Sequence, residues 1–461
     1  MLRKSRVIFA LCLVIMLFGV GLRATLAQDP TATPSDPIWL GFSAARDAIE
    51  EERSVNLTLI RSYNFRQAEF VTGIEVGCVE LGEDGRASRV YWGWVYDITD
   101  LNGRTYQARV SFDLNNVVVC DQVTEAAAPA EANTDSDLPA PVAGSAATGG
   151  FEIGGHILDL NGNTAGLLNR SGMSWVKKQL SFSVGDSPSK AQGLIDQAHS
   201  NGFKVLLGIV GNQSQMGDFN SYIQSYADFV GGVAALGADG IEVWNEPNID
   251  REWPAASING ANYTQMLAAA YNGIKSRRPE TLVISGAPAP TGFFGSAGCG
   301  SGGCNDDVFM QQMAQAGAGQ YLDCVGLHYN EGIVPPTQAG GDPRGEYPTY
   351  YFGSMLARGY GPFGGKPVCF TELGYLSGDG FDAAIPASFG WAGDTSVAEH
   401  AAWLAGAATQ AAQSGRVRLM IVWNVDFPFY TATDPMGGYA MFRPDGSCPA
   451  CDSVGSVMNA S

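Results

Sequence analysis

The stretch Ile241-Glu-Val-Trp-Asn-Glu-Pro-Asn248 combines a short apolar run with a carboxylate at the point where the run stops. A second stretch, Pro367-Val-Cys-Phe-Thr-Glu-Leu-Gly374, repeats this layout far downstream. Each apolar run is typical of a buried strand, and a proline or glycine breaks the strand pattern just beyond each glutamate. Parallel strands end at the same edge of a sheet, so we expect Glu246 and Glu372 to face one crevice.

Strand-like runs alternate with helical patterns throughout the segment that follows residue 150. Between the runs, apolar residues recur at helical spacing, for example from Phe219 to Val233 and from Tyr263 to Ile274, as in helices that pack on a sheet. Eight strands across roughly 310 residues favour a (β/α)8 barrel. An open doubly wound sheet is the alternative, but no Gly-rich phosphate fingerprint follows the first run. The runs lie at 151–157, 174–180, 204–210, 240–244, 281–285, 324–328, 367–370 and 418–423.

A change in composition separates this segment from the N-terminal part of the chain. Residues 124–150 are mostly Ala, Pro, Gly and Ser, which predicts a flexible linker because too little apolar surface is present to form a core. Residues 38–123 show a helical pattern near 44–52 and strand-like runs at 56–60, 70–76, 89–96 and 106–112. The sequence therefore predicts a small α+β domain with an antiparallel sheet at 38–123, followed by the barrel at 151–461.

The first 27 residues have the layout of a secretory signal. Basic residues precede an apolar run from Val7 to Leu22, and Thr25-Leu-Ala27 offers small residues for cleavage. The run is short for a membrane span, although an uncleaved anchor is the alternative. We expect the mature protein to be secreted or held at the cell surface, without further contact with a membrane.

The charge balance excludes one class of partner. The chain carries 27 basic and 46 acidic residues, a net charge of -19. Such a charge repels nucleic acids and anionic membrane surfaces, and it favours a soluble extracellular protein. It does not indicate a substrate.

Cysteine usage agrees with export. Cys12 lies in the predicted signal, and the eight cysteines that remain are an even number, which favours disulfides in an exported chain. The Cys-Pro-Ala-Cys spacing near the C-terminus also suits a redox centre or a metal ion, but no histidine or second motif of that kind lies nearby. The expected pairs are Cys78–Cys120, Cys299–Cys304 and Cys448–Cys451, while Cys324 and Cys369 are either bridged or simply buried.

Two carboxylates in one crevice are the groups that cleavage of a glycosidic bond needs. One carboxyl must be protonated to donate to the leaving oxygen, and the other must be ionised to attack the anomeric carbon. Two carboxyls about 5 Å apart perform both tasks, since the charge of one holds the proton on the other. An isolated Asn-Glu-Pro motif is also compatible with an acid on a surface loop, and the matched second glutamate favours the catalytic interpretation.

A family resemblance rests on these motifs. Trp244-Asn-Glu-Pro-Asn248 and Phe370-Thr-Glu372 resemble the acid/base and nucleophile motifs of the clan A glycoside hydrolases, the cellulase-like (β/α)8 enzymes, and the resemblance extends from about Gly150 to the C-terminus. It implies that Glu246 is the general acid/base and Glu372 the nucleophile of a retaining mechanism. It also implies that Asn245 hydrogen-bonds the 2-hydroxyl of the sugar.

Four further residues are candidates for substrate binding. His328 and Tyr329 resemble the clan's His and Tyr that line the sugar subsite, but they are adjacent here, whereas many members have one residue between them. Neighbouring side chains of a strand face opposite ways, so His328 is the safer candidate, with a structural histidine as the alternative. Trp423 resembles the tryptophan under the sugar ring, or is a core residue. Trp253 either lines an outer subsite or caps its loop.

Two basic residues are weaker candidates. Lys177 follows Trp175 on the second predicted strand, where many members of the clan have an arginine. Lysine does not replace a forked guanidinium without consequence, so its role is open. His156 lies near the end of the first predicted strand and is a candidate of the same kind.

The sequence as a whole predicts a secreted, retaining glycoside hydrolase that acts as a monomer on a β-linked polysaccharide or oligosaccharide. Two carboxylates need neither a metal nor an organic cofactor, so we expect none. Three alternatives remain: a catalytically silent carbohydrate-binding barrel, a surface adhesion protein whose N-terminal domain is the working part, and a transglycosylase that uses the same residues.

Overall fold

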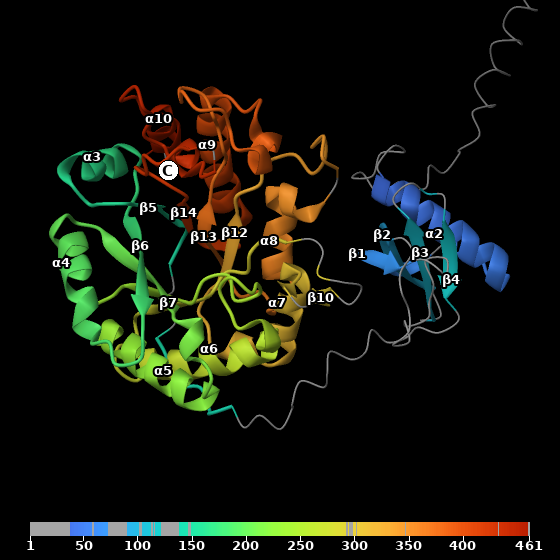
Figure 1. Cartoon of the computed structure of the whole chain (residues 1–461), viewed down its shortest axis with the longest axis horizontal. Helices are drawn as coiled ribbons and strands as arrows, with labels where there is room; N and C mark the ends of the chain where they lie inside the picture. Colours follow the sequence, from blue (N-terminus) through green and yellow to red (C-terminus); the bar gives the residue numbers. More distant parts are fainter. Residues whose placement is uncertain are drawn as a thin grey trace, which may run out of the picture.

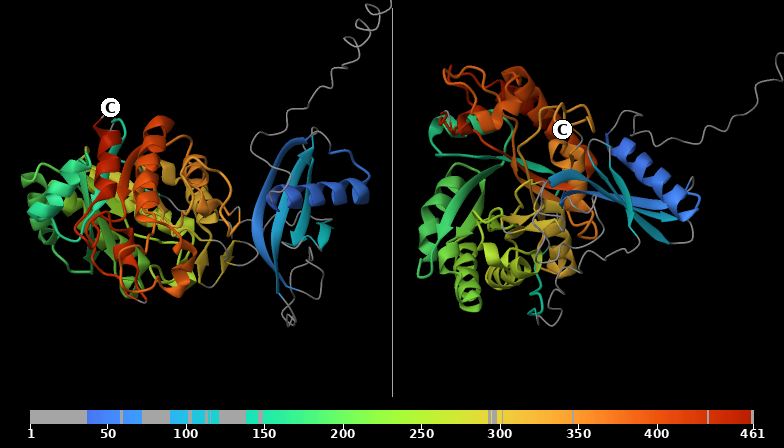
Figure 2. Two further views of the ribbon diagram at one scale, coloured as in Figure 1. Left: turned by 90° about the horizontal axis from the view of Figure 1, so that it is seen from above. Right: turned by 45° about the vertical axis from the view of Figure 1, so that its right-hand side comes forward.

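The computed structural model of the protein (Figures 1 and 2) describes most of the segment after residue 149 and parts of the segment before it. The predicted signal, residues 1–27, lies outside the described residues. Those described are 37–57, 60–71, 90–100, 104–111, 114, 116–120, 138–145, 149–291, 294, 298–300, 302–345, 347–431 and 433–459.

The C-terminal segment forms a parallel eight-stranded barrel. The strands pair in the order β12-β13-β14-β5-β6-β7-β8-β9. A parallel bridge between Ile284 and Cys324 joins the two ends of this order and closes the sheet. The predicted (β/α)8 barrel is confirmed, and each of the eight predicted runs overlaps one strand. The strands are β5 (Glu152–His156), β6 (Trp175–Phe182), β7 (Lys204–Gly211), β8 (Gly240–Val243), β9 (Leu282–Ser285), β12 (Val325–Tyr329), β13 (Val368–Leu373) and β14 (Val417–Val422).

A helix follows each strand of the barrel and covers its outer surface (Figure 1). Several helices begin where a side chain accepts a backbone N–H, including Asp218 before α5 and Ser396 before α9. The cap at Ser396 is reciprocal, because Glu399 accepts from the backbone of Ser396. The helices are α3 (Gly162–Arg170), α4 (Gln192–Ser200), α5 (Phe219–Ala235), α6 (Gly260–Lys275), α7 (Asp306–Gln315), α8 (Phe352–Tyr360), α9 (Val397–Ser414) and α10 (Pro449–Met458).

The inside of the barrel is filled in layers. One layer is apolar, and alternate residues of neighbouring strands supply it, as expected for side chains that point inward at every second position. The next inward positions are different: β6 contributes Lys177 and β8 contributes Glu242, and both side chains are fully buried. A charged layer therefore lies directly above an apolar one. The apolar layer consists of Trp175, Leu206, Leu282, Ile284, Cys324, Cys369, Leu419 and Ile421.

The N-terminal segment contains α2 (Pro37–Arg53) and an antiparallel sheet with the order β1-β2-β3-β4. The helix packs on the sheet through Phe42, Ala45 and Ile49. The predicted α+β class is confirmed, but the predicted break between the first two strands is wrong, because a single strand, β1 (Ile60–Val71), runs through residues 61–69. Residues 58–59 and 72–76 of the two predicted runs lie outside the described residues. The antiparallel pairing of β1 with β2 (Val90–Asp100) carries it through the polar residues between the two apolar runs. The other strands are β3 (Thr105–Ser111) and β4 (Val117–Cys120), and β4 was not predicted.

Part of the predicted linker lies against the barrel. The amide of Asn272 on α6 accepts a hydrogen bond from the backbone of Val142 at 2.8 Å and donates to the carbonyl of Ala140 at 3.1 Å. The hydroxyl of Tyr321 donates to the carbonyl of Pro139 at 2.8 Å. The chain is therefore tied to the barrel before its first strand begins. Residues 124–137 and 146–148 lie outside the described residues.

Three disulfides cross-link residues of the barrel segment. Cys299–Cys304 and Cys448–Cys451 confirm two predicted pairs, and Cys324–Cys369 links the neighbouring strands β12 and β13 near their starts. Cys120 is disulfide-bonded, and its predicted partner, Cys78, lies outside the described residues. Over the part of the chain that is described, no helix is both long enough and apolar enough to cross a membrane.

Candidate active site

Both predicted glutamates approach one histidine at the ends of the strands. The Nδ1 atom of His328 lies 3.2 Å from Oε1 of Glu246 and 3.8 Å from Oε2 of Glu372. His328 is fully buried near the end of β12, Glu372 lies near the end of β13, and Glu246 follows β8. The structure therefore brings three of the predicted site residues together, from three different strands.

Glu372 reaches this place because β13 pairs irregularly with its neighbours. Cys369 points into the barrel and Phe370 packs outward on Phe352, so strict alternation would point Glu372 outward as well. The pairing with β12 shifts by one residue at this point, and Glu372 lies opposite His328. A bulge of this kind re-aims a side chain, and such bulges occur often beside active sites.

Glu246 is aimed by an unusual turn after β8. Trp244 has φ of 76° and Glu246 has φ of 43°, although neither is a glycine. Backbone in this region is strained for ordinary side chains and persists only where the surroundings hold it. The surroundings do so here: the amide of Trp244 donates to Ile209 at 3.1 Å, and the amide of Glu246 donates to Ala287 at 3.0 Å.

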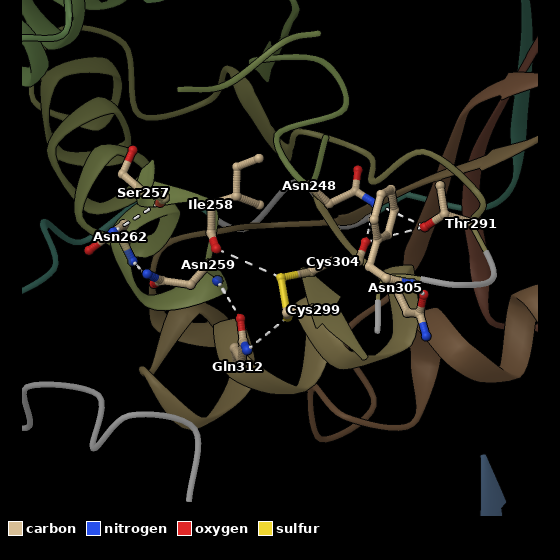
Figure 3. Close-up of a disulfide and its surroundings, with 12 residues drawn as sticks. Asn248, Ser257, Ile258, Asn259, Asn262, Thr291, Cys299, Cys304, Asn305 and Gln312 are labelled. Carbon is tan, nitrogen blue, oxygen red and sulfur yellow. Dashed lines mark hydrogen bonds between the residues drawn. A yellow bond between two sulfur atoms is a disulfide. The ribbon is translucent and has the colours of Figure 1, made fainter. Parts of the chain in front are cut away.

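Asn248 ties the same turn to a disulfide-closed hairpin (Figure 3). Its fully buried amide donates to the carbonyls of Ala289 and Cys304, each at 3.0 Å, and accepts from the backbone of Ala289 at 2.7 Å. Cys304 closes the hairpin with Cys299, and its own amide donates to the carbonyl of Asn248 at 2.8 Å. The loop that carries Glu246 is therefore anchored to the loop that follows β9.

The charge of the two carboxylates controls the protonation of His328. Burial by itself would lower the pKa of His328, but the charge of Glu372 and the hydrogen bond and charge of Glu246 outweigh it, so the pKa is raised. The raised pKa favours an imidazolium between two carboxylates. The Nε2 atom of His328 is buried and has no hydrogen-bond partner in the described part of the protein.

Glu246 is also paired on its outer side. Arg251, in the same loop, donates to Oε2 of Glu246, and the arginine side chain is 70% exposed whereas that of Glu246 is 13% exposed. Burial would raise the pKa of Glu246, but the hydrogen bond from His328 and the charges of His328 and Arg251 lower it. Glu252 beside them has a raised pKa, from burial and from the charge of Glu246. We call Glu246, Arg251 and Glu252 the loop rim.

A second group lies inside the barrel, under the carboxylate of Glu372. Lys177 Nζ is 2.8 Å from Oε2 of Glu242 and 3.5 Å from Oε1 of Glu372, and it donates to the carbonyl of Thr371 at 3.1 Å. Burial would lower the pKa of Lys177, but the charges of Glu242 and Glu372 and their hydrogen bonds raise it. We call Lys177, Glu242 and Glu372 the buried floor.

Two asparagines border the carboxylates. Asn330, in the loop after β12, donates to Oε2 of Glu372 at 3.4 Å. Asn245 directly precedes Glu246 and is buried. The amide oxygen of each asparagine is buried without a hydrogen-bond partner among the described residues. Buried polar atoms normally have partners, so these two acceptors are suited to hydroxyl donors of a ligand.

Trp423 lies at the end of the last barrel strand and is partly exposed. It directly follows β14, and its ring centroid is 4.6 Å from that of His156 and 5.4 Å from that of Phe427. Burial, and then the charges of Lys177 and other neighbours, place the pKa of His156 well below its usual value, so this imidazole is neutral. An indole face on a neutral histidine is an apolar surface at the mouth of the barrel.

Two predicted binding residues lie elsewhere. Trp253 is fully buried, its indole packs edge-to-face against Trp244 and Tyr263, and its side chain offers no surface to a ligand. The placement at an outer subsite is wrong for this reason. Tyr329 faces away from His328, as strand alternation requires, and its hydroxyl donates to the carbonyl of Tyr350 at 3.1 Å. Tyr329 is likewise fully buried, so it is a packing residue.

The sequence missed three residues near the carboxylates: Glu242, Arg251 and Asn330. Glu242 left a signal, because it is a charge in the middle of an apolar strand, at the inward position between Ile241 and Val243. The other two lie in loops, where no periodicity predicts the direction of a side chain. Across the described ranges, no group of three or more His, Cys, Asp or Glu side chains is arranged to hold a metal ion.

Comparisons with known proteins concern the fold. No protein-family model matches the chain, and no curated protein matches it in sequence. Similar solved structures include a family 39 glycoside hydrolase from Bacteroides cellulosilyticus WH2, with 14% identity and a TM-score of 0.48 over 86% of this chain and 77% of that one. An endo-1,4-beta-mannanase from Rhizomucor miehei has 14% identity and a TM-score of 0.44 over 68% and 96%.

A third similar structure is the endoglucanase Cel5A from Thermotoga maritima, with 10% identity and a TM-score of 0.41 over 66% of this chain and 96% of that one. These neighbours are clan A glycoside hydrolases, the family that the sequence motifs resemble. At such low identities and scores the likeness does not bear on chemistry, which rests on the geometry of the site.

Proposed function

We propose that this protein is a secreted, retaining glycoside hydrolase that cleaves a β-linked glycan. The observation that carries the proposal is the single nitrogen of His328 within reach of Glu246 and Glu372 at the ends of two barrel strands. Conserving the stereochemistry requires two carboxyls close together, and inversion requires room for a water molecule between them. A shared histidine favours the closer arrangement.

In the first step, Glu372 attacks the anomeric carbon while the glycosidic C–O bond breaks. The carboxyl of Glu246 gives its proton to the leaving oxygen, and Glu372 becomes a neutral glycosyl ester. In the second step, a water molecule gives a proton to Glu246 and attacks the same carbon, which restores the carboxylate of Glu372. Asn245, Asn330 and His328 supply polar groups for the sugar hydroxyls, and Trp423 supplies the apolar face on which a ring stacks.

The protonation of the free protein differs from what the first step needs. Glu246 must be protonated at the moment of cleavage, but His328 and Arg251 lower its pKa. The lowered pKa of Glu246 and the raised pKa of His328 both favour a proton on His328, and the exposed guanidinium of Arg251 pairs with the outer oxygen of Glu246. A leaving-group sugar in this position displaces Arg251, which removes one charge that opposes protonation of Glu246.

Export fits the same proposal. Three disulfides in the barrel are typical of a protein that folds in an oxidising compartment, and the predicted signal at residues 1–27 supplies the route. We propose that the protein acts outside the cell, as a monomer, on polysaccharide or oligosaccharide chains.

The test is a hydrolysis screen of the full-length mature protein against β-linked plant, fungal and bacterial polysaccharides, with release of reducing ends as the measurement. Glu246→Gln and Glu372→Gln are each expected to abolish most turnover while the circular dichroism spectrum stays unchanged. Glu280→Gln is the matched control, because Glu280 is exposed and pairs with Arg278 away from the site.

Two results would contradict the proposal. Full activity in both glutamine variants would show that other groups carry the reaction. Tight binding of a glycan without release of products would instead identify a catalytically silent carbohydrate-binding barrel. Nuclear magnetic resonance of the first product formed reports retention or inversion of the anomeric carbon directly.

A further inference from the structure

Glu242 has one strong partner and no evident place in the reaction. It lies inside the barrel on β8, four residues before Glu246, and its side chain is fully buried. In the described part of the protein its ion pair is with Lys177, and beyond that pair neither of its carboxylate oxygens has a hydrogen-bond partner. Gly208 on β7 leaves room for it, since a Cβ there would lie 3.1 Å from Oε2 of Glu242. A buried carboxylate with this surrounding needs an explanation.

Lys177 is the link between Glu242 and the site. Lys177 forms ion pairs with the carboxylates of Glu242 and Glu372, and it donates a hydrogen bond to the carbonyl of Thr371. Thr371 and Glu372 are adjacent on β13, so this one amine fixes both the backbone and the side chain of the nucleophile. Its orientation depends on keeping all three contacts.

The chemistry proposed above would change the charge next to Lys177. When Glu372 forms the glycosyl ester, its negative charge disappears, and a buried ammonium paired with Glu372 alone would lose its counter-ion. An unpaired charge in a dry interior is strongly disfavoured, and a lysine then gives up its proton. An arginine in this position would stay charged, whereas a lysine needs a second, permanent partner.

We propose that Glu242 is a positioning residue that acts through Lys177: it is the permanent counter-charge that keeps this lysine protonated and directed at Glu372 throughout the catalytic cycle. The inference rests on the proposed glycoside hydrolase function. Other charged or titratable groups that face this region are His156 on β5, Tyr226 on α5, Glu246 after β8, Tyr263 on α6 and His328 on β12.

The first measurement needs no substrate. Lysine labelled with ¹⁵N at Nζ reports the titration of each amine by nuclear magnetic resonance, in wild type and in Glu242→Gln. We expect the pKa of Lys177 to fall by one unit or more in the variant. The internal control is Lys275, which is also fully buried but pairs with Asp323 and two carbonyls on another part of the barrel, and its pKa is expected not to move. An unchanged pKa of Lys177 overturns the proposal.

The second measurement is the pH profile of kcat on the best glycan from the screen. In Glu242→Gln the alkaline limb is expected to move to lower pH by one unit or more, because Lys177 loses its proton earlier, and kcat at the optimum is expected to fall at least about tenfold. Glu152→Gln is the matched control: this glutamate also lies on a barrel strand and pairs with Lys204 and Arg418, but at the opposite end. That variant is expected to lose stability without moving the limb.

A third variant tests whether the earlier loss of the Lys177 proton, and no other effect of Glu242→Gln, displaces the alkaline limb. Combining Glu242→Gln with Lys177→Arg leaves a cation that keeps its proton without a counter-charge. The alkaline limb of this double variant is expected to match that of the wild type. Two outcomes overturn the proposal. In the first, the alkaline limb of kcat moves to lower pH in the double variant as well. In the second, Lys177 titrates at lower pH in Glu242→Gln, but the alkaline limb stays where it is in the wild type.

The failure of the proposed function would look different from the failure of this inference. If no glycan is cleaved by the wild type, the hydrolase proposal fails. The titration of Lys177 then still decides whether Glu242 keeps Lys177 protonated. If glycans are cleaved and Lys177 titrates identically with and without Glu242, the hydrolase proposal stands and only this inference falls.

Discussion

The buried floor and the loop rim each contain a glutamate paired with a cation, but one pair is buried and the other is exposed. On the floor, Glu372 lies against Lys177, which is fully buried and held by Glu242 and a backbone carbonyl. On the rim, Glu246 lies against Arg251, which is 70% exposed. A buried pair cannot exchange partners with water, whereas an exposed pair contributes little and opens easily. Glu372, the proposed nucleophile, is therefore held by a fixed cation, and Glu246, the proposed acid/base, is paired with a cation that can dissociate.

The largest expected effect separates the tasks of the two glutamates. Glu372→Ala is expected to lose about 10³-fold or more in kcat on every substrate, because no other group on the floor can attack carbon. Glu246→Ala is expected to lose about 10² to 10⁴-fold on a polysaccharide but far less on an aryl glycoside with an acidic phenol, which leaves without a proton. Steady-state kinetics on both substrates is the measurement. Equal losses on the two substrates in Glu246→Ala would contradict its role as acid.

Two disulfides of the barrel segment are expected to stabilise the fold to different extents. Cys324–Cys369 joins two strands at a sequence separation of 45, whereas Cys299–Cys304 closes a hairpin at a sequence separation of 5, near the rim. Loop-closure entropy then predicts that Cys324→Ala/Cys369→Ala lowers the free energy of unfolding by about 4 kcal/mol, and Cys299→Ala/Cys304→Ala by about 2 kcal/mol. Denaturant unfolding measures both. The reverse order would show that the hairpin, through its contacts with Asn248, matters more than loop length.

Stacking of a sugar ring on Trp423, which lies in neither the buried floor nor the loop rim, is expected to have a smaller effect on catalysis. Trp423→Ala is expected to raise KM about 3- to 10-fold, because a stacked aromatic contact is worth roughly 0.5–1.5 kcal/mol. Phe429→Ala is the control, since Phe429 is an exposed aromatic residue in the same loop. A change in kcat with no change in KM would indicate that Trp423 supports His156 instead of the sugar.

The smallest expected effect tests whether Arg251, the cation of the loop rim, can dissociate from Glu246. Arg251 lowers the pKa of Glu246, so Arg251→Gln raises that pKa. Cleavage needs the protonated form of Glu246, which then survives to higher pH, and the alkaline limb of kcat/KM moves upward. Because the pair is exposed, we expect a shift of only a few tenths of a pH unit.

The measurement is the pH profile of kcat/KM for Arg251→Gln beside Arg277→Gln, an exposed arginine paired with Asp228 on the outer helices. The control profile should coincide with that of the wild type. A downward shift in Arg251→Gln would contradict the sign of this argument, and a shift of more than a unit would mean that the rim pair is as rigid as the floor.

The barrel, two of its disulfides (Cys299–Cys304 and Cys448–Cys451) and the approach of Glu246 and Glu372 to one place could all be predicted from the sequence. These follow from local signals: apolar runs with strand spacing, helices with a repeated apolar face, and acids at strand ends. The same signals failed where pairing overrides pattern. In β1 the pairing with β2 carries one strand through polar residues, and in β13 a shift in register turns Glu372 into the barrel.

The groups that surround the two glutamates could not be predicted from the sequence, because they come from distant strands and from loops. Trp253 is a residue type that often stacks on sugars, but here it packs in the core. Arg251 and Asn330 reach the carboxylates from loops, whose sequences have no periodic pattern. Lys177 and Glu242 are 65 positions apart in the chain and meet because β6, β7 and β8 lie side by side. A strand pattern tells which face a side chain occupies, and only closure of the barrel tells which charges share its interior.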